Sequence, residues 1–213
     1  MGDIELASTL KTKGITDERV LGAMASLSRQ EFVPLEETAA ATHDAALGIG
    51  HGQTISQPFV VAVMTQALGV RPGERVLEVG TGSGYQAAVL ARLGVDVWSI
   101  ERIPQLADEA RHRLTRLGFP HVHLKVGDGT RGWPDAAPFD AIIVTAAAPR
   151  IPVALIEQLA PGGRLIAPVG PVSASQELVL LEKDEHGSVA RVAPFLPVQF
   201  VPLIEDSRPA RVH

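Results

Sequence analysis

A glycine-rich turn lies between an apolar strand pattern and a helix pattern. The stretch from Val76 to Gly84 places the strand, the turn and the helix start in series, with glycines at positions 80, 82 and 84. Glycine is required where a backbone takes positive φ or approaches a ligand closely. The G-x-G-x-G spacing differs from the G-x-G-x-x-G of the dinucleotide fingerprint, because the third glycine is not at the usual place. It therefore disfavours a pyrophosphate and favours S-adenosylmethionine (AdoMet), which carries no phosphate.

Three carboxylates accompany this turn. Glu101 ends the next predicted strand, where an acid can accept both ribose hydroxyls, and Asp128 follows the third strand, where it can read an adenine amine. Glu78 lies inside the apolar strand and needs a partner, such as a cofactor ammonium or loop N–H groups. The alternative is an ordinary turn with solvated strand ends. The expected cofactor contacts are Glu78, Gly80, Thr81, Gly82, Ser83, Gly84, Glu101, Asp128 and Gly129.

A polar segment from Gln53 to Pro58 precedes an apolar helix predicted over residues 58–68, with Ser56 as its N-cap. A helix N-terminus is an anion site, because free backbone N–H groups and the positive end of the helix dipole point outward. We therefore expect an anion to be held beside the cofactor. The segment supplies four further expected cofactor contacts: Gln53, Thr54, Ile55 and Ser56.

The side chains of this region indicate an acceptor that needs no base. A carboxylate has a reference pKa of about 3.9 and is already ionised at pH 7, whereas an amine held as its cation needs a base or a polar cage. The chain offers Ser56, Thr54, Gln53 and Thr145 near the expected site, but no His–acid dyad and no Asn-Pro-Pro-Tyr cage. We expect Ser56 to orient a carboxylate rather than to act as a base. The alternative is that Ser56 is only a helix cap.

The elements that position these residues alternate between strands and helices from Arg75 onward. This order is typical of an α/β, doubly wound, Rossmann-like methyltransferase fold with a mostly parallel sheet, an N-terminal helical extension and C-terminal antiparallel strands. We expect parallel strands over 76–79, 96–100, 122–126, 141–145 and 164–168, helices over 85–93, 104–117 and 152–159, and antiparallel strands over 177–181, 189–192 and 199–201.

The N-terminal third is predicted to combine helices with a long loop. Thr16 is the expected N-cap of a helix over 17–25, and residues 36–57 form a connection of a length that is often functional. We expect a single domain over 1–213. Its parts are a helical segment with the substrate loop (1–70), a cofactor core (71–170), C-terminal strands (171–205) and a tail (206–213).

The composition excludes several classes of function. The chain has 213 residues, a net charge of −5 and no cysteine, which excludes disulfides, thiolate nucleophiles and Cys-ligated zinc. The negative charge argues against a nucleic-acid partner, and no histidine pair has the spacing of metal ligands. No apolar run is long enough to span a membrane, and the first residues lack a signal-peptide pattern. We expect a cytoplasmic monomer without a metal or a membrane partner.

Several segments together resemble the protein-L-isoaspartate (D-aspartate) O-methyltransferases, from about Gly14 to Leu203. Many methyltransferases share the glycine turn, whereas the Gln-Thr-Ile-Ser-Gln-Pro segment placed before it is highly specific. The matching segments are residues 14–17, 29–34, 49–58, 77–85, 127–129, 139–147, 162–165 and 200–203.

This resemblance implies a reaction and a set of site residues. AdoMet would donate its methyl group to the α-carboxylate of L-isoaspartyl, and also D-aspartyl, residues in damaged peptides and proteins, which starts their repair. The serine that matches Ser56 is the active-site residue of the family, and the segment that matches Val201 to Leu203 helps to close the peptide site. The implied substrate contacts are Ser56, Thr145, Ala146, Val201, Pro202 and Leu203.

One loop departs from the family pattern, which has an Ala-Tyr pair before an aspartate and prolines after it. Here residues 41–48 read Ala-Thr-His-Asp-Ala-Ala-Leu-Gly, so an aromatic side chain and two stiffening prolines are missing from a loop that contacts the peptide. Two alternatives therefore remain beside the family's reaction. One is a methyltransferase of the same fold that acts on a small molecule or RNA. The other is an AdoMet-binding protein that has lost turnover.

Overall fold

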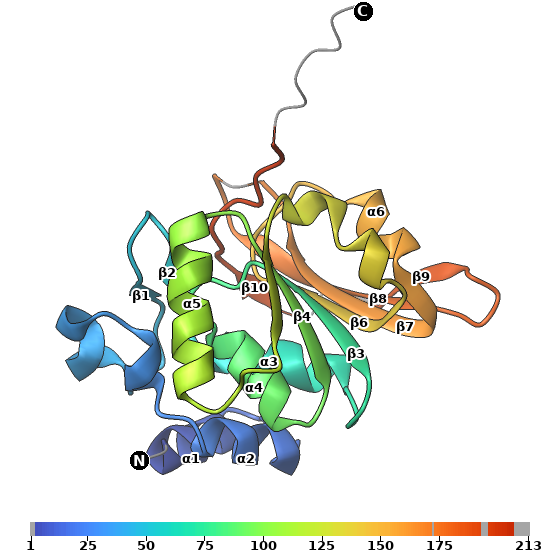
Figure 1. Ribbon diagram of the computed structural model, residues 1–213. Coiled ribbons are helices and arrows are strands. Elements are labelled where there is room, and N and C mark those ends of the chain that lie inside the picture. The colour runs from blue at the N-terminus through green and yellow to red at the C-terminus, as the bar shows by residue number, and fades with distance from the viewer. Residues whose placement is uncertain (1–2, 172, 193–195, 207–213) are drawn as a thin grey trace, which may run out of the picture.

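One mixed sheet forms the centre of the molecule (Figure 1). The computed structural model describes residues 3–171, 173–192 and 196–206. The strand order is β10-β8-β7-β6-β3-β4-β5, with β9 paired to β8, and the five strands from β7 to β5 run parallel. This arrangement confirms the predicted doubly wound fold. The strands are β3 (Arg75–Val79), β4 (Asp96–Glu101), β5 (His123–Val126), β6 (Phe139–Val144), β7 (Leu159–Val169), β8 (Gln176–Lys183), β9 (Val189–Val192) and β10 (Pro197–Val198).

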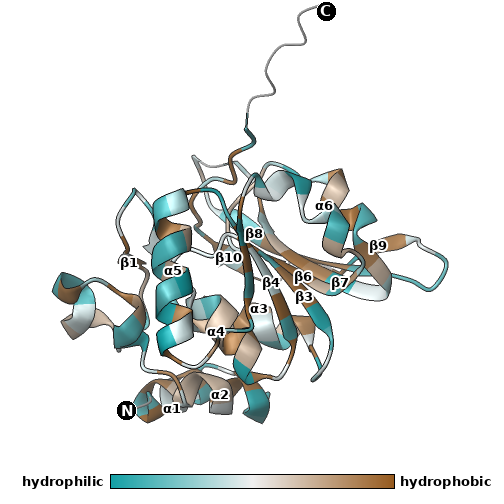
Figure 2. Ribbon diagram, viewed as in Figure 1, coloured by the Kyte–Doolittle hydropathy of each residue, from teal (hydrophilic) through white to brown (hydrophobic). Residues whose placement is uncertain are grey.

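Alternation of side chains along the strands divides the core into two parts. Val76 and Ile143 belong to one buried cluster, whereas their neighbours Leu77 and Ile142 belong to the other. Figure 2 shows the strands as largely apolar and the outward side of α5 as polar. The first face is covered by α3 (Pro58–Leu68), α4 (Tyr85–Arg92) and α5 (Pro104–Arg116), and the second by α6 (Val153–Glu157).

The helices α1 (Ile4–Thr12) and α2 (Glu18–Ala25) pack against each other and against α3. The N-cap of α2 is Asp17 rather than the predicted Thr16, because the Asp17 carboxylate accepts the Arg19 amide at 2.9 Å. The Thr16 amide donates instead to the side chain of Gln66. This contact fastens the start of α2 to α3.

The predicted long connection over residues 36–57 contains more regular structure than expected. Two 3₁₀ helices, η1 (Arg29–Phe32) and η2 (Leu35–Ala40), precede a short antiparallel pair of strands. These strands are β1 (Leu47–Gly48) and β2 (Thr54–Ile55). The segment that leads to α3 is therefore held by backbone pairing.

The C-terminal half differs from prediction in two places. The strand β7 begins well before the predicted residue 164. A register shift between Phe139 and Ala141 of β6 accommodates the extra residues of the Pro-Gly-Gly sequence at 161–163. We expected this sequence to end the preceding helix. The last strand lies at 197–198 rather than 199–201. Residues 207–213 of the expected tail lie outside the described residues. None of the described helices has the length and apolar character needed to cross a bilayer.

Candidate functional site

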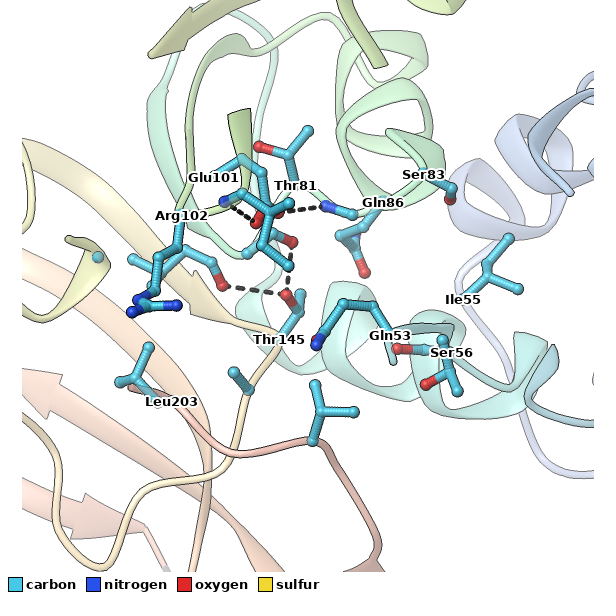
Figure 3. A pocket seen from close by; sticks show the side chains of 18 of the residues that line it. Gln53, Ile55, Ser56, Thr81, Ser83, Gln86, Glu101, Arg102, Thr145 and Leu203 are labelled. Atoms are coloured by element: carbon cyan, nitrogen blue, oxygen red, sulfur yellow. Dashed lines mark hydrogen bonds between the residues drawn. The ribbon is translucent and has the colours of Figure 1, made fainter. Parts of the chain in front are cut away.

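A cleft of about 900 Å³, open solvent included, lies at the carboxyl edge of the parallel strands (Figure 3). Ligands of open α/β sheets bind at this edge. In Figure 3, Ser56 and Ile55 lie on one side of the cleft, and Arg102 and Leu203 on the other. The lining residues are 53–56, Val61, 79–83, Tyr85, Gln86, 100–103, Gly129, Thr145, Ala146 and 201–204.

The glycine turn takes the strained backbone that its sequence predicts. Gly80, Gly82 and Gly84 have φ of 99°, 51° and 86°, which favour glycine over every other residue. A Cβ on Gly80 would also collide with the hydroxyl oxygen of Thr145. That hydroxyl lies 2.6 Å from the Gly80 carbonyl and 3.0 Å from the Val79 carbonyl, so its proton is used to hold the turn. Thr145 lines the cleft mainly as a brace.

Glu101 lies where the sequence places it, at the end of β4 and against the cleft. It is 6% exposed. Its two carboxylate oxygens accept the amides of Gly82 at 2.8 Å and Ile103 at 2.9 Å. Each oxygen keeps a second lone pair, so the group can still accept two hydroxyl protons. This geometry fits a ribose.

Glu78 is fully buried below the glycine turn and does not line the cleft. Burial raises its pKa to about 8, and the charge of Glu101 adds to the rise, although hydrogen bonds from the Ser99 hydroxyl and the Ala87 amide oppose it. The Ser99 hydroxyl lies 2.6 Å from that of Thr81, which faces the cleft. A chain of hydroxyls therefore joins Glu78 to the site. We expected a cofactor ammonium or loop N–H groups as its partner; the partners in the structure are the Ser99 hydroxyl and the Ala87 amide, and Glu78 does not line the cleft.

Asp128 lies at the rim and does not line the cleft, whereas its neighbour Gly129 does. Burial by itself raises the pKa of Asp128. This effect is outweighed by hydrogen bonds from the side chain and amide of Thr130 and from the amide of Asp206, together with the charge of Arg131, so the pKa lies below its ordinary value. The carboxylate thus caps a 3₁₀ turn and holds residue 206. These donors compete with an adenine amine.

The N-terminus of α3 already holds an anion from the chain itself. The N-cap is Gln57 without a side-chain cap, so the predicted capping role of Ser56 is wrong. The Asp44 carboxylate accepts the Phe59 amide at 2.8 Å and the Gln57 side chain at 3.1 Å, and it pairs with Lys13. Burial raises the pKa of Asp44, and these partners lower it below its ordinary value. A substrate carboxylate cannot use the same seat.

Ser56 is therefore free for another role. Its side chain lines the cleft, and within the described residues its hydroxyl has no hydrogen-bond partner that would occupy it. Gln53, Thr54 and Ile55 line the same wall. The segment predicted to approach the cofactor does lie at the cleft, although not as a helix cap.

The opposite wall comes from the end of the described chain. The Ala147 amide donates to the Val201 carbonyl and the Leu203 amide donates to the Ala147 carbonyl, each at 2.7 Å. Asp206 pairs with Arg102 at 3.0 Å. These contacts place Val201, Pro202 and Leu203 against the cleft beside Ala146. All the residues predicted to contact substrate lie at this one site.

Comparison with known proteins decides the family. The family model described as protein-L-isoaspartate(D-aspartate) O-methyltransferase (PCMT) matches residues 2–208. The chain belongs to this family.

Curated relatives of the same family cover nearly all of the chain. It is 58% identical over 200 residues to the protein-L-isoaspartate O-methyltransferase of Anaeromyxobacter dehalogenans strain 2CP-C, covering 93% of this chain and 95% of that one. It is 52% identical over 204 residues to that of Myxococcus xanthus, covering 95% and 96%. These values extend the family match to nearly the full length of both relatives.

Solved structures of the family share the fold. One protein-L-isoaspartate O-methyltransferase has a TM-score of 0.81 at 31% identity, over 94% of this chain and 65% of that longer one. A second, from Plasmodium falciparum in complex with S-adenosyl-L-homocysteine, has a TM-score of 0.84 at 25% identity, over 97% and 100%. The family's fold therefore holds over both the core and the N-terminal extension.

Sequence reasoning missed eight residues that line this cleft. Six of them stand beside motifs that were recognised, before and after the glycine turn and on either side of Glu101: Val79, Tyr85, Gln86, Ile100, Arg102 and Ile103. Their nearness to the carboxyl edge was a usable signal. The other two, Val61 and Ile204, come from a helix and a chain end whose positions depend on tertiary packing.

Proposed function

We propose that this chain transfers a methyl group from AdoMet to the α-carboxylate of L-isoaspartyl residues in damaged proteins and peptides, with D-aspartyl residues as a second acceptor. The observation that carries the proposal is the single cleft in which the glycine turn and Glu101 face the family-specific segment that contains Ser56. Family membership supports both the methyl donor and the acceptor.

The residues on the sheet side of the cleft fit AdoMet. Backbone at Gly80 and Gly82 can approach the ligand without an intervening side chain, and Glu101 offers acceptors for the ribose. Gly84, which we expected to contact the cofactor, does not line the cleft and packs against α5. When bound, AdoMet supplies an electrophilic methyl group on a sulfonium. Two contacts hold the glycine turn, which would bind the cofactor. The Gly80 amide donates to the Ile100 carbonyl at 2.8 Å, and the Thr145 hydroxyl donates to the Gly80 carbonyl.

The acceptor side needs to aim a carboxylate rather than to deprotonate it. No histidine lines the described cleft, and an α-carboxyl group has a pKa of about 3.5 and is ionised at pH 7. Holding two reactants in line supplies about 7–11 kcal/mol of the barrier reduction. A hydrogen bond from Ser56 weakens as the carboxylate loses charge, so we assign it to orientation and selection of the anion.

The apolar parts of the acceptor wall keep water away from that carboxylate. Ile55 on one side and Ala146, Val201 and Leu203 on the other bring methyl and methylene groups to the cleft. Removing water from an anionic nucleophile strengthens its interaction with a cationic donor. The net charge of −5 supports a peptide acceptor over RNA.

The test uses labelled AdoMet with two peptides that differ only in an L-isoaspartyl or an L-aspartyl residue. We expect base-labile methanol release from the isoaspartyl peptide alone. Ser56→Ala should lower kcat/KM for this peptide by about tenfold or more, the value of one hydrogen bond to a charged group. Ser188→Ala, in an exposed turn, is the matched control. Cofactor binding without methanol release would instead support an inactive AdoMet-binding protein.

A pH profile separates aiming from base catalysis. If Ser56 orients an ionised carboxylate, Ser56→Ala changes the rate without moving any ionisation near pH 7. An ionisation near neutrality that governs the wild-type rate and disappears in the variant would contradict this role.

A further inference from the structure

Arg29 is a buried cation with an unusual set of partners. Its side chain is 0% exposed, in the 3₁₀ helix η1. The guanidinium donates to four backbone carbonyls, through Nη1 to Ala41 at 2.9 Å and His43 at 3.2 Å and through Nη2 to Ala45 at 2.8 Å and Ser56 at 3.1 Å. One side chain thus gathers carbonyls from two separate segments.

Only one of these two segments lines the cleft, at Ser56, the proposed orienting residue. The other, residues 41–45, belongs to the loop that departs from the family pattern and does not line the cleft. The contact with Ser56 joins positions 27 residues apart in sequence. Asp44 reinforces it, because its carboxylate binds Gln57 and the Phe59 amide on the other side of Ser56. The loop and the Ser56 backbone are therefore fastened to each other from both sides.

The geometry requires arginine. A guanidinium is a planar fork whose two terminal nitrogens can serve carbonyls that lie apart, whereas a lysine ammonium is a single point with three donors. No carboxylate forms an ion pair with Arg29 in the described part of the chain, and its Nε lacks a partner there. Burying such a cation costs stability. Burial also lowers the pKa of Arg29, an effect that Tyr85, Asp44 and Asp3 oppose.

The other face of η1 reaches the cofactor side. The Phe32 ring packs edge-on against Tyr85, with centroids 5.2 Å apart. Tyr85 is the first residue of α4, directly after Gly84 of the glycine turn. The short helix that carries Arg29 thus contacts the element that begins at the cofactor turn and the backbone of Ser56.

We propose that Arg29 is a positioning residue for methyl transfer, which fixes the Ser56 backbone at the cleft by tying it to residues 41–45 and contacts neither ligand. The proposal deepens the proposed function and rests on it for the role of Ser56. It accounts for order in a loop that lacks the aromatic residue and prolines of the family pattern. The cofactor turn is held separately, by Thr145, Ile100 and Glu101.

The test compares Arg29→Lys with Arg164→Lys. Arg164 is a partly buried arginine on β7 that does not line the cleft, and its Nε also lacks a partner in the described chain. We expect Arg29→Lys to lower kcat/KM for the isoaspartyl peptide by about 100-fold, the effect of a misplacement near 1 Å. Binding of S-adenosyl-L-homocysteine should change by less than about threefold, since its main contacts lie on the sheet. Arg164→Lys should leave both values near wild type.

Chemical rescue and hydrogen exchange distinguish positioning from general destabilisation. Ethylguanidinium at millimolar concentration should restore part of the activity of Arg29→Ala and none of that of Ser56→Ala. In Arg29→Lys, amides of residues 41–57 should exchange faster while those of residues 80–86 do not. The exchange experiment needs no substrate, so it tests the role of Arg29 independently of activity. If wild-type protein methylates no isoaspartyl peptide, the proposed function is refuted, but the exchange result still tests whether Arg29 positions residues 41–57.

Several results would overturn the proposal. Peptide kcat/KM of Arg29→Lys within twofold of wild type would do so, as would equal losses of peptide turnover and S-adenosyl-L-homocysteine binding. Unchanged exchange at residues 41–57, or acceleration spread evenly over the chain, would show that Arg29 only stabilises the fold.

Discussion

Glu78→Gln tests the protonation state of the buried carboxyl below the glycine turn. In the folded chain its pKa is raised to about 8 by burial, whereas in the unfolded chain it returns to its ordinary value of 4.5. Between these values the folded state holds a proton that the unfolded state has released, so the stability due to this group is complete below pH 4.5 and falls as pH rises. The free energy of unfolding should decrease by about 1.4 kcal/mol per pH unit in this window. The loss reaches about 3 kcal/mol at pH 7.

Glutamine cannot ionise, yet it keeps an acceptor for the Ser99 hydroxyl. We therefore expect the difference in unfolding free energy, Glu78→Gln minus wild type, to rise by about 3 kcal/mol between pH 4.5 and pH 7 and to level off above pH 8. Urea denaturation of ligand-free protein at half-unit pH steps measures it. Other titrating groups cancel in the difference. Glu177→Gln, at an exposed position on β8, controls for the substitution itself.

The change of this free-energy difference with pH, rather than its absolute size, shows whether Glu78 is protonated in the folded state. A difference that stays flat from pH 4.5 to pH 8 would mean that Glu78 is ionised in the folded state, and our account of a neutral carboxyl beneath the turn would be refuted.

Three further predictions address the supports of the cleft. Asp44→Asn should destabilise the protein at pH 7 by about 1.5–3 kcal/mol. Because the pKa of Asp44 is lowered in the folded state, the stabilisation from this carboxylate is present above about pH 4 and is lost as pH falls further. The Tm of the variant should therefore fall less steeply with decreasing pH than the Tm of wild type. Equal slopes of Tm against pH would contradict this. Gly80→Ala should weaken S-adenosyl-L-homocysteine binding at least tenfold by calorimetry, because the new Cβ meets the Thr145 hydroxyl at a strained φ worth about 1–3 kcal/mol; wild-type affinity would mean that the turn adapts. Asp206→Ala should change stability by less than about 1 kcal/mol, since its ion pair with Arg102 is half-exposed and its amide remains bound; a fall in Tm of many degrees would contradict this.

Local signals made part of this structure predictable. The helix α3 has the predicted bounds because Pro58 stands at its first turn and Gly69 takes a left-handed conformation at its end. The glycine turn and Glu101 were found because their spacing follows from one strand-turn-helix unit and the strand directly after it. Both features depend on residues that are neighbours in sequence.

Long-range contacts made the rest unpredictable. Nothing in the Ser-Gln-Pro sequence indicates that Asp44, from a loop of unfamiliar sequence, occupies the N-terminus of α3, so the anion site predicted there was filled. Likewise the Pro-Gly-Gly sequence at 161–163 indicated a turn, yet a bulge lets β7 continue through it. In both cases a tertiary partner decides between two local conformations that the sequence alone permits equally.

The hydrogen bonds around Asp128 have a consequence for the ageing of the protein itself. Asp128-Gly129 is the only Asp-Gly step in the chain, and the chain has no asparagine. Isoaspartate forms when the amide nitrogen after an aspartate attacks the protonated side-chain carboxyl to give a cyclic imide. Here the carboxyl is kept ionised by a lowered pKa and is held by Thr130 and the Asp206 amide. The sequence step most prone to this damage is thus held in an unreactive state while the fold persists.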